Sequence, residues 1–270
     1  MPTLVRTALF AALVAGLFGS YATAEPTTRP TTARASQGRI ERRTYDFKEA
    51  GKEMEYALFV PGAYDKSKRW PLVVALHGLY SNPQQIMHYP GLTDQAERRG
   101  YLVVAPMGYN ARGWYGAVPL VKGKAEDPPN LSELSERDVL NVLDIVRKEY
   151  NVDPDRVYLL GHSMGGGGTW HLAIKYPDLW AALAPIAPAT LRPAGDVERI
   201  KHVPVILVQG ARDYLVKVER VRPWAAKMKE LGMTHEYLEY PNGDHITVAF
   251  TSLPKIFAFF DKHKRGETRP

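Results

Sequence analysis

Short apolar runs bounded by turn residues recur along the chain from residue 39 onward. Five of them contain almost no polar side chain, at residues 72–76, 102–105, 157–160, 181–186 and 205–208. Such runs are typical of strands that are buried on both faces of a sheet. Three further strands are predicted at residues 39–47 and 54–60, which are joined around Gly51, and at the alternating run 234–240.

Between these runs, apolar residues recur at helical spacing. This spacing predicts helices at residues 93–99, 131–150, 164–175 and 218–231, and a final helix rich in phenylalanine after residue 245. Parallel strands need crossover connections, which helices supply. The alternation therefore predicts a doubly wound, mostly parallel α/β sheet with helices on both faces, formed by one domain at residues 40–262.

The two ends of the chain depart from this pattern. Residues 1–24 combine Arg6, an apolar run at residues 8–18 and small residues up to Ala24, as a secretory signal peptide does. That run rises only about 16 Å as a helix, so we expect no permanent membrane anchor but export to the periplasm or the exterior after cleavage near Ala24. We expect residues 25–39 to form a flexible lead segment before the domain, and residues 263–270 to form a charged tail after it.

Composition narrows the possible chemistry and partners. The 270 residues include no cysteine, which excludes disulfides, thiolate nucleophiles and cysteine metal sites. The formal charge of +6 belongs to the ends of the chain, because residues 44–260 are neutral overall. A nucleic-acid binder should carry its basic stripe on the folded body. We therefore expect no nucleic-acid partner.

Residues 161–165 carry a motif of known chemistry, Gly-His-Ser-Met-Gly. The motif follows a predicted strand and precedes a predicted helix, which is the context of a nucleophile elbow. Side chains larger than glycine at its two ends would collide with the strand and the helix in so tight a turn. We expect Ser163 to be a nucleophile raised above the sheet, the alternative being a serine that only caps the helix.

A serine nucleophile needs a base, and a carboxylate that orients the base. His245 follows the last predicted strand in a turn and is the expected base, the alternative being an ordinary surface histidine. Asp213 follows the strand at 205–208, at the edge where open α/β sheets bind ligands, and Asp196 is the second choice. The order Ser163, Asp213, His245 is that of α/β hydrolases.

An oxyanion hole needs two main-chain N–H groups that point at the developing charge. We expect Met164 to supply one, because the first N–H groups of a helix have no partner within it. Leu79, in the loop after the strand at 72–76, is the expected second donor, with Tyr80 as the alternative. We expect His77 to brace this loop.

A long loop at residues 107–130 follows the strand at 102–105. Loops of this length in a compact domain are usually functional or disordered. Trp114 and Tyr115 offer aromatic faces for a sugar ring or a phenolic acyl group, which makes the loop a candidate substrate wall. Packing of both rings across the sheet edge is an equal alternative.

These motifs resemble the α/β-hydrolase superfamily, and within it the small secreted esterases that include polyhydroxybutyrate depolymerase-like, feruloyl and acetylxylan esterases and esterase D. The resemblance lies in LVVALHG at 72–78, NVDPDRVYLLGHSMGGG at 151–167, VILVQGARD at 205–213 and GDH at 243–245. The sequence is also similar to an isolated catalytic domain of the prolyl oligopeptidase type, without the propeller. Only residues 188–202 separate the sixth and seventh strands, which predicts an open cleft without a lid.

The resemblance implies a secreted serine hydrolase that cleaves carboxylic esters through an acyl-enzyme, with no metal or other cofactor. Its substrate would be a small-molecule or polymer-linked ester, such as an acyl ester of a sugar, a plant polysaccharide or a polyester. Two alternatives stay open: a serine peptidase with the same triad, and a non-catalytic ligand-binding protein on the same scaffold. The sequence carries no signal for an oligomeric state.

Overall fold

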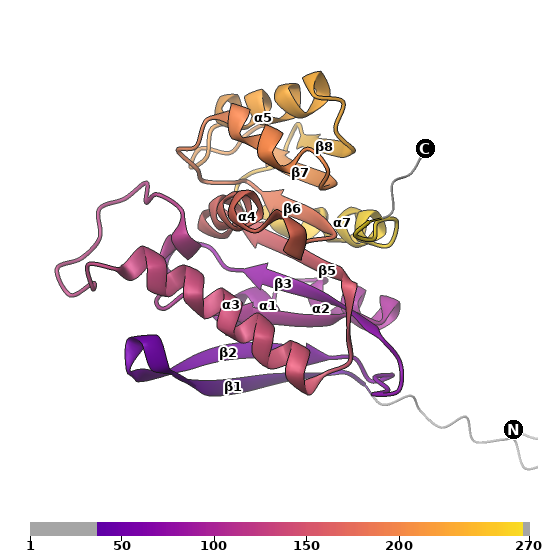
Figure 1. The fold of residues 1–270 in the computed structure, drawn as a ribbon. Helices are drawn as coiled ribbons and strands as arrows, with labels where there is room; N and C mark the ends of the chain where they lie inside the picture. The colour runs from indigo at the N-terminus through magenta and orange to yellow at the C-terminus, as the bar shows by residue number, and fades with distance from the viewer. Residues whose placement is uncertain (1–36, 267–270) are drawn as a thin grey trace, which may run out of the picture. The chain divides into compact units, whose positions relative to one another are not determined.

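The computed structural model describes residues 37–266, in which eight strands form one sheet in the order β1-β2-β4-β3-β5-β6-β7-β8 (Figure 1). The strands are β1 Arg39–Phe47, β2 Lys52–Val60, β3 Trp70–Leu76, β4 Leu102–Pro106, β5 Val152–His162, β6 Ala182–Ile186, β7 Val205–Gly210 and β8 His235–Tyr240. β2 is antiparallel to both β1 and β4, and all the other neighbours run parallel. The predicted mostly parallel sheet is confirmed.

Helices cover both faces of this sheet. They are α1 Pro83–Met87, α2 Leu92–Arg99, α3 Leu131–Glu149, α4 Met164–Lys175, α5 Val218–Glu230, α6 Thr247–Thr251 and α7 Leu253–Phe260. Apolar side chains of α3, α4 and α5 pack in one core cluster, and those of α1, α2, α6 and α7 pack in a second. The sheet therefore lies between two helical layers.

Strand β3 shows why both layers are needed. Leu72, Val74 and Leu76 join the first core cluster, whereas Val73 and Ala75 join the second. Successive side chains of a strand point to opposite faces, so a strand that is apolar at every position needs cover on both. Burying one such aliphatic side chain stabilises the fold by about 1.5–3 kcal/mol. A polar residue on either face would forfeit that contribution.

Three elements differ from the sequence prediction. The final helix is divided into α6 and α7 at Ser252, because Pro254 at the start of α7 has no N–H group to continue the helix. Helix α1 has only five residues, too few to show periodicity, and is capped by the Asn82 side chain, which accepts from Gln85 N–H at 3.0 Å. Strand β5 begins at Val152, earlier than predicted, where Trp70 pairs with it.

Because the strands from β3 to β8 are parallel, their carboxyl ends meet at one edge of the sheet. The loops after β3, β4, β6, β7 and β8 and the turn after β5 all lie there, at the left in Figure 1. No helix within residues 37–266 is long and apolar enough to cross a membrane. The predicted signal peptide and its cleavage site lie outside the described residues.

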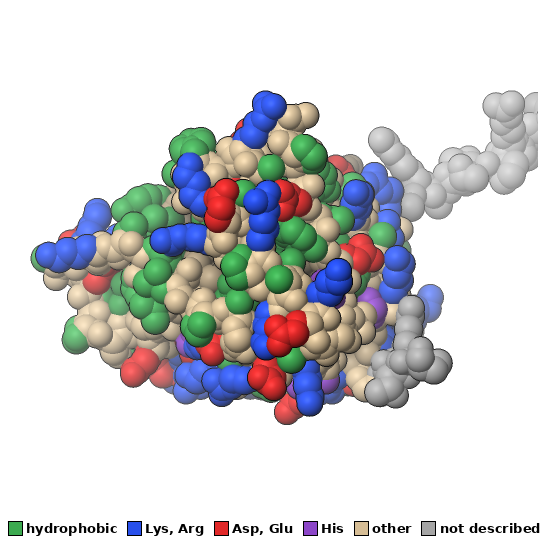
Figure 2. All heavy atoms as spheres, turned by 90° about the horizontal axis from the view of Figure 1, so that it is seen from above, with side chains coloured by type: hydrophobic (Ala, Val, Ile, Leu, Met, Phe, Trp, Pro, Cys, Tyr) green, Lys and Arg blue, Asp and Glu red, His purple; other side chains and the backbone are tan. Residues whose placement is uncertain are grey.

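Basic and acidic side chains are interspersed over the face seen in Figure 2. Among residues 37–266 several such side chains are paired, for example Arg43 with Glu149 and Arg222 with Glu239. Exposed pairs of this kind contribute about 0–1 kcal/mol each. The stability of the fold therefore rests on its two apolar cores.

Candidate active site

Ser163 lies in the tight turn between β5 and α4. Its backbone angles, φ 58° and ψ −114°, are unusual for a residue with a side chain, and such strain costs about 1–3 kcal/mol. The Ser163 N–H donates to Ile186 O at 2.9 Å, and the Ser163 carbonyl accepts from Gly167 and Ala189 at 3.0 and 2.9 Å. These bonds hold the turn in the strained conformation that a nucleophile elbow requires.

Glycines on both sides of Ser163 permit very close backbone packing. A Cβ atom on Gly161 would lie 2.1 Å from Gly165 O, and one on Gly165 would lie 2.1 Å from Leu76 O. At residues 166–168 an added Cβ would meet its nearest neighbours at 2.7, 2.0 and 2.8 Å. The first turn of α4 therefore lies directly against β3 and the loop after β6.

The side chains of Asp213 and His245 meet in a hydrogen bond of 2.7 Å between Oδ2 and Nδ1, and these residues are only 3% and 4% exposed. The main chains of their two loops are also joined. Arg212 N–H donates to Gly243 O at 2.9 Å, and a Cβ on Gly210 would lie 2.5 Å from that same oxygen. The structure thus brings together two of the three predicted triad residues.

The carboxyl group of Asp213 is held by donors on both oxygens. Oδ1 accepts from the N–H groups of Leu215 and Val216 at 2.9 and 2.8 Å, and Oδ2 also accepts from Gln209 Nε2 at 3.3 Å. Burial alone would raise the pKa of Asp213, but the hydrogen bonds from His245 and these N–H groups lower it below its ordinary value. The carboxylate therefore stays ionised and accepts a hydrogen bond from Nδ1–H, which leaves Nε2 of His245 with a lone pair.

Gln209 is a buried residue that the sequence analysis does not single out. Its amide donates to Val216 O at 2.8 Å as well as to Asp213, so it fixes the turn that carries the carboxylate. In the sequence, Gln209 is only the first polar residue after the apolar run 205–208, which gives no sign of its contact with Asp213.

Ser163 and His245 lie on neighbouring segments. The ring of His245 is 4.9 Å, between centroids, from the ring of His162, the residue that precedes Ser163. No hydrogen bond joins Ser163 Oγ to His245 in the described part of the chain. In free enzymes such contacts are commonly long and shorten when substrate binds.

The loop after β3 lies beside Ser163, since a Cβ on Gly78 would be 3.6 Å from Ser163 Cβ. Tyr80 N–H donates to Ala111 O at 2.8 Å, so the alternative oxyanion donor is already engaged. The N–H groups of Leu79 and Met164, by contrast, have no hydrogen-bond partner among residues 37–266. The two expected donors thus remain available next to the elbow.

His77 braces this loop from inside the core. It is fully buried, with Nδ1 2.8 Å from Gly78 O and Nε2 2.9 Å from Met107 O. Its ring thereby links the loop after β3 to the end of β4, and burial lowers the pKa of the imidazole. This arrangement fits the expected structural role.

Trp114 and Tyr115, the expected substrate wall, are instead part of the core. They are 2% and 0% exposed, in the short 3-10 turn Trp114–Gly116, where positive φ angles accompany inward-facing rings. Tyr115 Oη accepts from His77 N–H at 3.1 Å, and Tyr115 N–H donates to Ser135 Oγ at 2.9 Å. The substrate-wall prediction is wrong for these two residues, because neither presents a face to solvent.

Asp196, the alternative triad acid, belongs to a separate charged network. It lies in the 3-10 helix Ala194–Ile200 and accepts from Arg192 at 2.8 Å. Arg192 in turn donates to His171 Nδ1 at 3.3 Å, and His171 Nε2 donates to Glu136 at 2.6 Å. Asp196 is therefore paired away from His245.

Glu136 is the centre of that network. Its carboxylate also accepts from Lys175 and Tyr176, each at 2.6 Å. Burial alone would raise the pKa of Glu136, but the hydrogen bonds from His171, Lys175 and Tyr176 lower it to about 2. These bonds tie α3 to α4, the helix that begins at the elbow.

We expect Glu136→Gln to lower the free energy of unfolding by about 3 kcal/mol at pH 7. The folded-state pKa lies below the unfolded value, so this stabilisation is present above about pH 5 and is lost as the pH falls toward 2. Urea unfolding at pH 7 and pH 3 measures it, with Glu133→Gln on the exposed face of α3 as the control. Equal stability of the Glu136 variant and the wild type at pH 7 would contradict the assignment.

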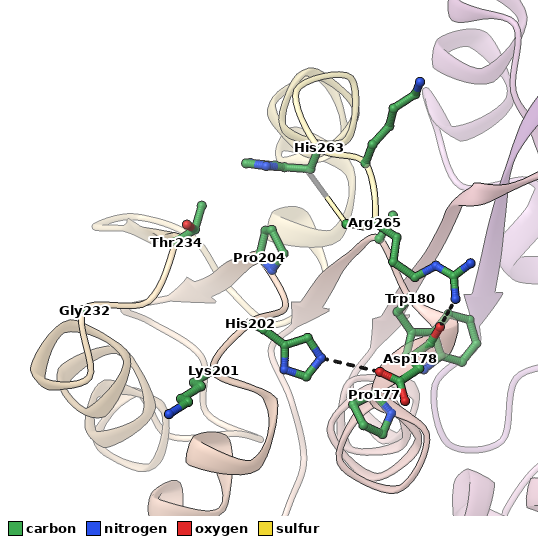
Figure 3. A pocket seen from close by; sticks show the side chains of 13 residues that line it. Pro177, Asp178, Trp180, Lys201, His202, Pro204, Gly232, Thr234, His263 and Arg265 are labelled. Atoms are coloured by element: carbon green, nitrogen blue, oxygen red, sulfur yellow. Dashed lines mark hydrogen bonds and ion pairs between the residues drawn. The ribbon is translucent and has the colours of Figure 1, made fainter. Parts of the chain in front are cut away.

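A cavity of about 330 Å³ lies at the opposite edge of the sheet, where β6, β7 and β8 begin (Figure 3). Asp178 lies on its wall, with Arg265 donating to its carbonyl oxygen at 2.6 Å and His202 3.9 Å from its carboxylate. The predicted triad follows the ends of strands, so this cavity is not part of the candidate active site. Within residues 37–266, no three His, Asp or Glu side chains gather as metal ligands would.

Comparison with known proteins places the chain among esterases. A family model described as "Putative esterase" matches residues 48–260. The bifunctional acetylxylan esterase/xylanase XynS20E of Neocallimastix patriciarum is 30% identical over 154 residues, covering 56% of this chain and 20% of that protein. The S-formylglutathione hydrolase of Rattus norvegicus is 31% identical over 158 residues, covering 53% of this chain and 55% of that protein. The chain thus spans about a fifth to about half of the length of these relatives.

Solved structures give the same result for the fold. A thermostable esterase matches with a TM-score of 0.68 and 28% identity, covering 84% of this chain and 63% of that one. A ferulic acid esterase matches with a TM-score of 0.68 at 18% identity, which bears on the fold alone. The family match takes in the elbow and both loops that meet at Asp213 and His245, and the chain belongs to the esterase family, with the α/β-hydrolase fold.

Proposed function

We propose that the protein is a secreted serine hydrolase that cleaves carboxylic esters through an acyl-enzyme. One observation carries this proposal: the 2.7 Å hydrogen bond between Asp213 and His245 lies beside the strained turn that presents Ser163, in a chain of the esterase family. The names of the relatives, which include acetylxylan esterase and S-formylglutathione hydrolase, support ester substrates.

In the proposed reaction, Ser163 Oγ attacks the ester carbonyl carbon and His245 Nε2 takes the hydroxyl proton. Asp213 holds Nδ1 and stabilises the imidazolium that forms. The tetrahedral intermediate collapses, and the alcohol leaves with the proton from His245. Water, deprotonated by His245, then attacks the acyl-enzyme, and its collapse releases the acid and returns the proton to Ser163.

The negative charge of each tetrahedral intermediate would lie on the former carbonyl oxygen. The N–H groups of Leu79 and Met164 are the proposed donors to that oxygen. Donors held in place before reaction need no reorganisation as charge develops, and one such donor is commonly worth a factor of about 10²–10³ in kcat. The bracing of the Leu79 loop by His77 and Tyr115 fits this role.

Exposed apolar side chains gather in the loops at the sheet edge of the proposed site. The most exposed large hydrophobic residues of the described chain all lie in loops after strand ends at this edge: Tyr80, Val118, Val121, Leu191, Tyr214, Leu215 and Ile246. Tyr80, Tyr214 and Ile246 directly follow Leu79, Asp213 and His245 in the sequence. Apolar and aromatic surface at a cleft suits substrates with extended hydrophobic faces. We therefore propose acyl esters of sugars, plant polysaccharides or polyesters as substrates.

Export completes the proposed function, and it rests on the pattern of residues 1–24. Expression of the full chain with analysis of the mature amino terminus tests it. We expect the exported protein to begin at Glu25. Retention of residues 1–24 on a cell-associated protein would contradict export by cleavage.

A panel of acetyl, feruloyl and hydroxybutyryl esters, with a peptide anilide as a comparison, tests the activity. We expect ester turnover that exceeds anilide turnover, because the peptidase alternative differs only in substrate. Labelling by a fluorophosphonate, located by mass spectrometry, should fall on Ser163. Anilide cleavage faster than every ester would favour the peptidase, and absence of both turnover and labelling would favour a binding protein.

A further inference from the structure

His162 is a buried histidine that the proposed reaction does not use. It ends β5 directly before Ser163, and it is 2% exposed. Its Nε2 lies 2.8 Å from the main-chain oxygen of His245, and its Nδ1 lies 2.9 Å from Tyr89 Oη. Both ring nitrogens thus have partners, and one of these is the backbone of the proposed base.

These two partners decide where the His162 proton lies. A carbonyl oxygen can only accept, so Nε2 carries the hydrogen and donates it to His245 O. Nδ1 then has a free lone pair and accepts from the Tyr89 hydroxyl. Burial, together with the nearby His245 ring, lowers the pKa of His162 to about 4, so the ring is neutral at neutral pH.

Tyr89 is held in turn by the helix after the base. Its ring packs edge-on against Phe250 of α6, with centroids 5.1 Å apart and planes at 83°. Tyr89 also contacts the His162 ring edge-on at 5.7 Å. The position of the His162 ring is therefore fixed by a packed neighbour as well as by two hydrogen bonds.

The turn that carries His245 has two attachments to the rest of the site. The side chain is bound by Asp213, from the loop after β7, and the main-chain oxygen is bound by His162, from the end of β5. Because His162 and Ser163 are consecutive, the second attachment connects the base to the nucleophile through one hydrogen bond and one peptide unit.

We propose that His162 is a positioning residue, whose Nε2–H bond to the main-chain oxygen of His245 sets the distance between the base and Ser163. The proposal rests on the proposed function, because it needs His245 to act on Ser163. A neutral ring suits this role, since a charged one 4.9 Å from the His245 ring would oppose the imidazolium that forms during reaction. Misplacement by about 1 Å can cost about 10²-fold in rate.

The central test compares His162→Leu with His162→Gln. Leucine fills space but donates no hydrogen bond, so we expect kcat to fall about 10²-fold with little change in KM. Glutamine keeps a donor for the carbonyl and an acceptor for Tyr89, so it should restore most of kcat. The rate of fluorophosphonate labelling at Ser163 should follow kcat, since it needs the base but not the substrate pocket.

Two further variants keep the test decisive. Tyr89→Phe retains the ring against Phe250 but removes the donor to Nδ1, and we expect a smaller fall in kcat, on the order of tenfold, consistent with the loss of one hydrogen bond. This variant serves if His162→Leu does not fold, as judged by thermal unfolding. The exposed His202 at the opposite edge, changed to glutamine, is the control and should match the wild type.

The outcomes separate the two proposals. The positioning role would be overturned if His162→Leu kept the wild-type kcat and labelling rate. It would also be overturned if His162→Gln were as impaired as His162→Leu. If His162→Leu does not fold, unchanged kcat in Tyr89→Phe would do the same. Wild-type protein that neither turns over esters nor labels at Ser163 would instead overturn the proposed function.

Discussion

Replacing Ser163 with alanine should lower kcat for a short acyl ester by a factor on the order of 10⁶, the scale found when a triad nucleophile is removed from other serine hydrolases. Alanine cannot form the acyl-enzyme, and what turnover remains would come from the oxyanion donors and from substrate binding. Steady-state kinetics on purified protein measures the loss. Fluorophosphonate labelling should disappear in the same variant.

The matched control is Ser67→Ala, which removes a hydroxyl that bonds only to Asp65 in an exposed turn. We expect this variant to keep the kcat of the wild type. Thermal unfolding of both variants shows whether the fold is intact. Turnover near the normal rate in Ser163→Ala would end the assignment of Ser163 as the nucleophile.

Asp213→Asn should lower kcat by about 10⁴-fold, the loss seen for the equivalent change in a chymotrypsin-like triad. The reason lies in the N–H groups of Leu215 and Val216, which both donate to one oxygen of Asp213. The amide oxygen of asparagine would take that position, so its NH₂ group would face His245 Nδ1. The imidazole would then carry its proton on Nε2, where it could not accept one from Ser163.

Asp196→Asn is the control for this variant, because Asp196 is also a loop carboxylate after a strand but pairs with Arg192. It should leave kcat close to the wild-type value. A fall of similar size in both variants would mean that carboxylates in these loops act through stability. A wild-type rate in Asp213→Asn would exclude Asp213 as the acid.

The sheet was predictable from sequence because apolar runs buried on both faces leave an unambiguous signal. The run at 72–76 predicts β3 to within two residues, since each of its positions is buried and apolar. The predicted boundary of β5 was poorer, because Pro154 and the charged residues around it hide the strand's first half. Helix α1 escaped prediction, since its cap and a single turn carry no periodicity.

Some residues of the candidate site could likewise be predicted from the sequence, and others could not. Ser163, Asp213 and His245 could be predicted as the candidate triad because the elbow motif and the ends of strands are visible in the sequence, and the structure joins Asp213 to His245. Trp114 and Tyr115 were misplaced because a loop sequence does not show which way its rings turn, and the left-handed angles at both residues are set by tertiary packing. The contact between Tyr89 and His162 joins residues 73 positions apart and has no signature in the sequence.

The glycines from 165 to 168 have a consequence for any attempt to change the substrate range. Most of these positions face backbone atoms that cannot move aside, so a random library that includes them would consist largely of unfolded protein. Diversity is better placed at Leu191, Tyr214 and Leu215, whose side chains are more than half exposed and rest on no core cluster. The backbone at residues 165–168 would then stay unchanged in every variant, while the exposed side chains are selected for activity on new esters.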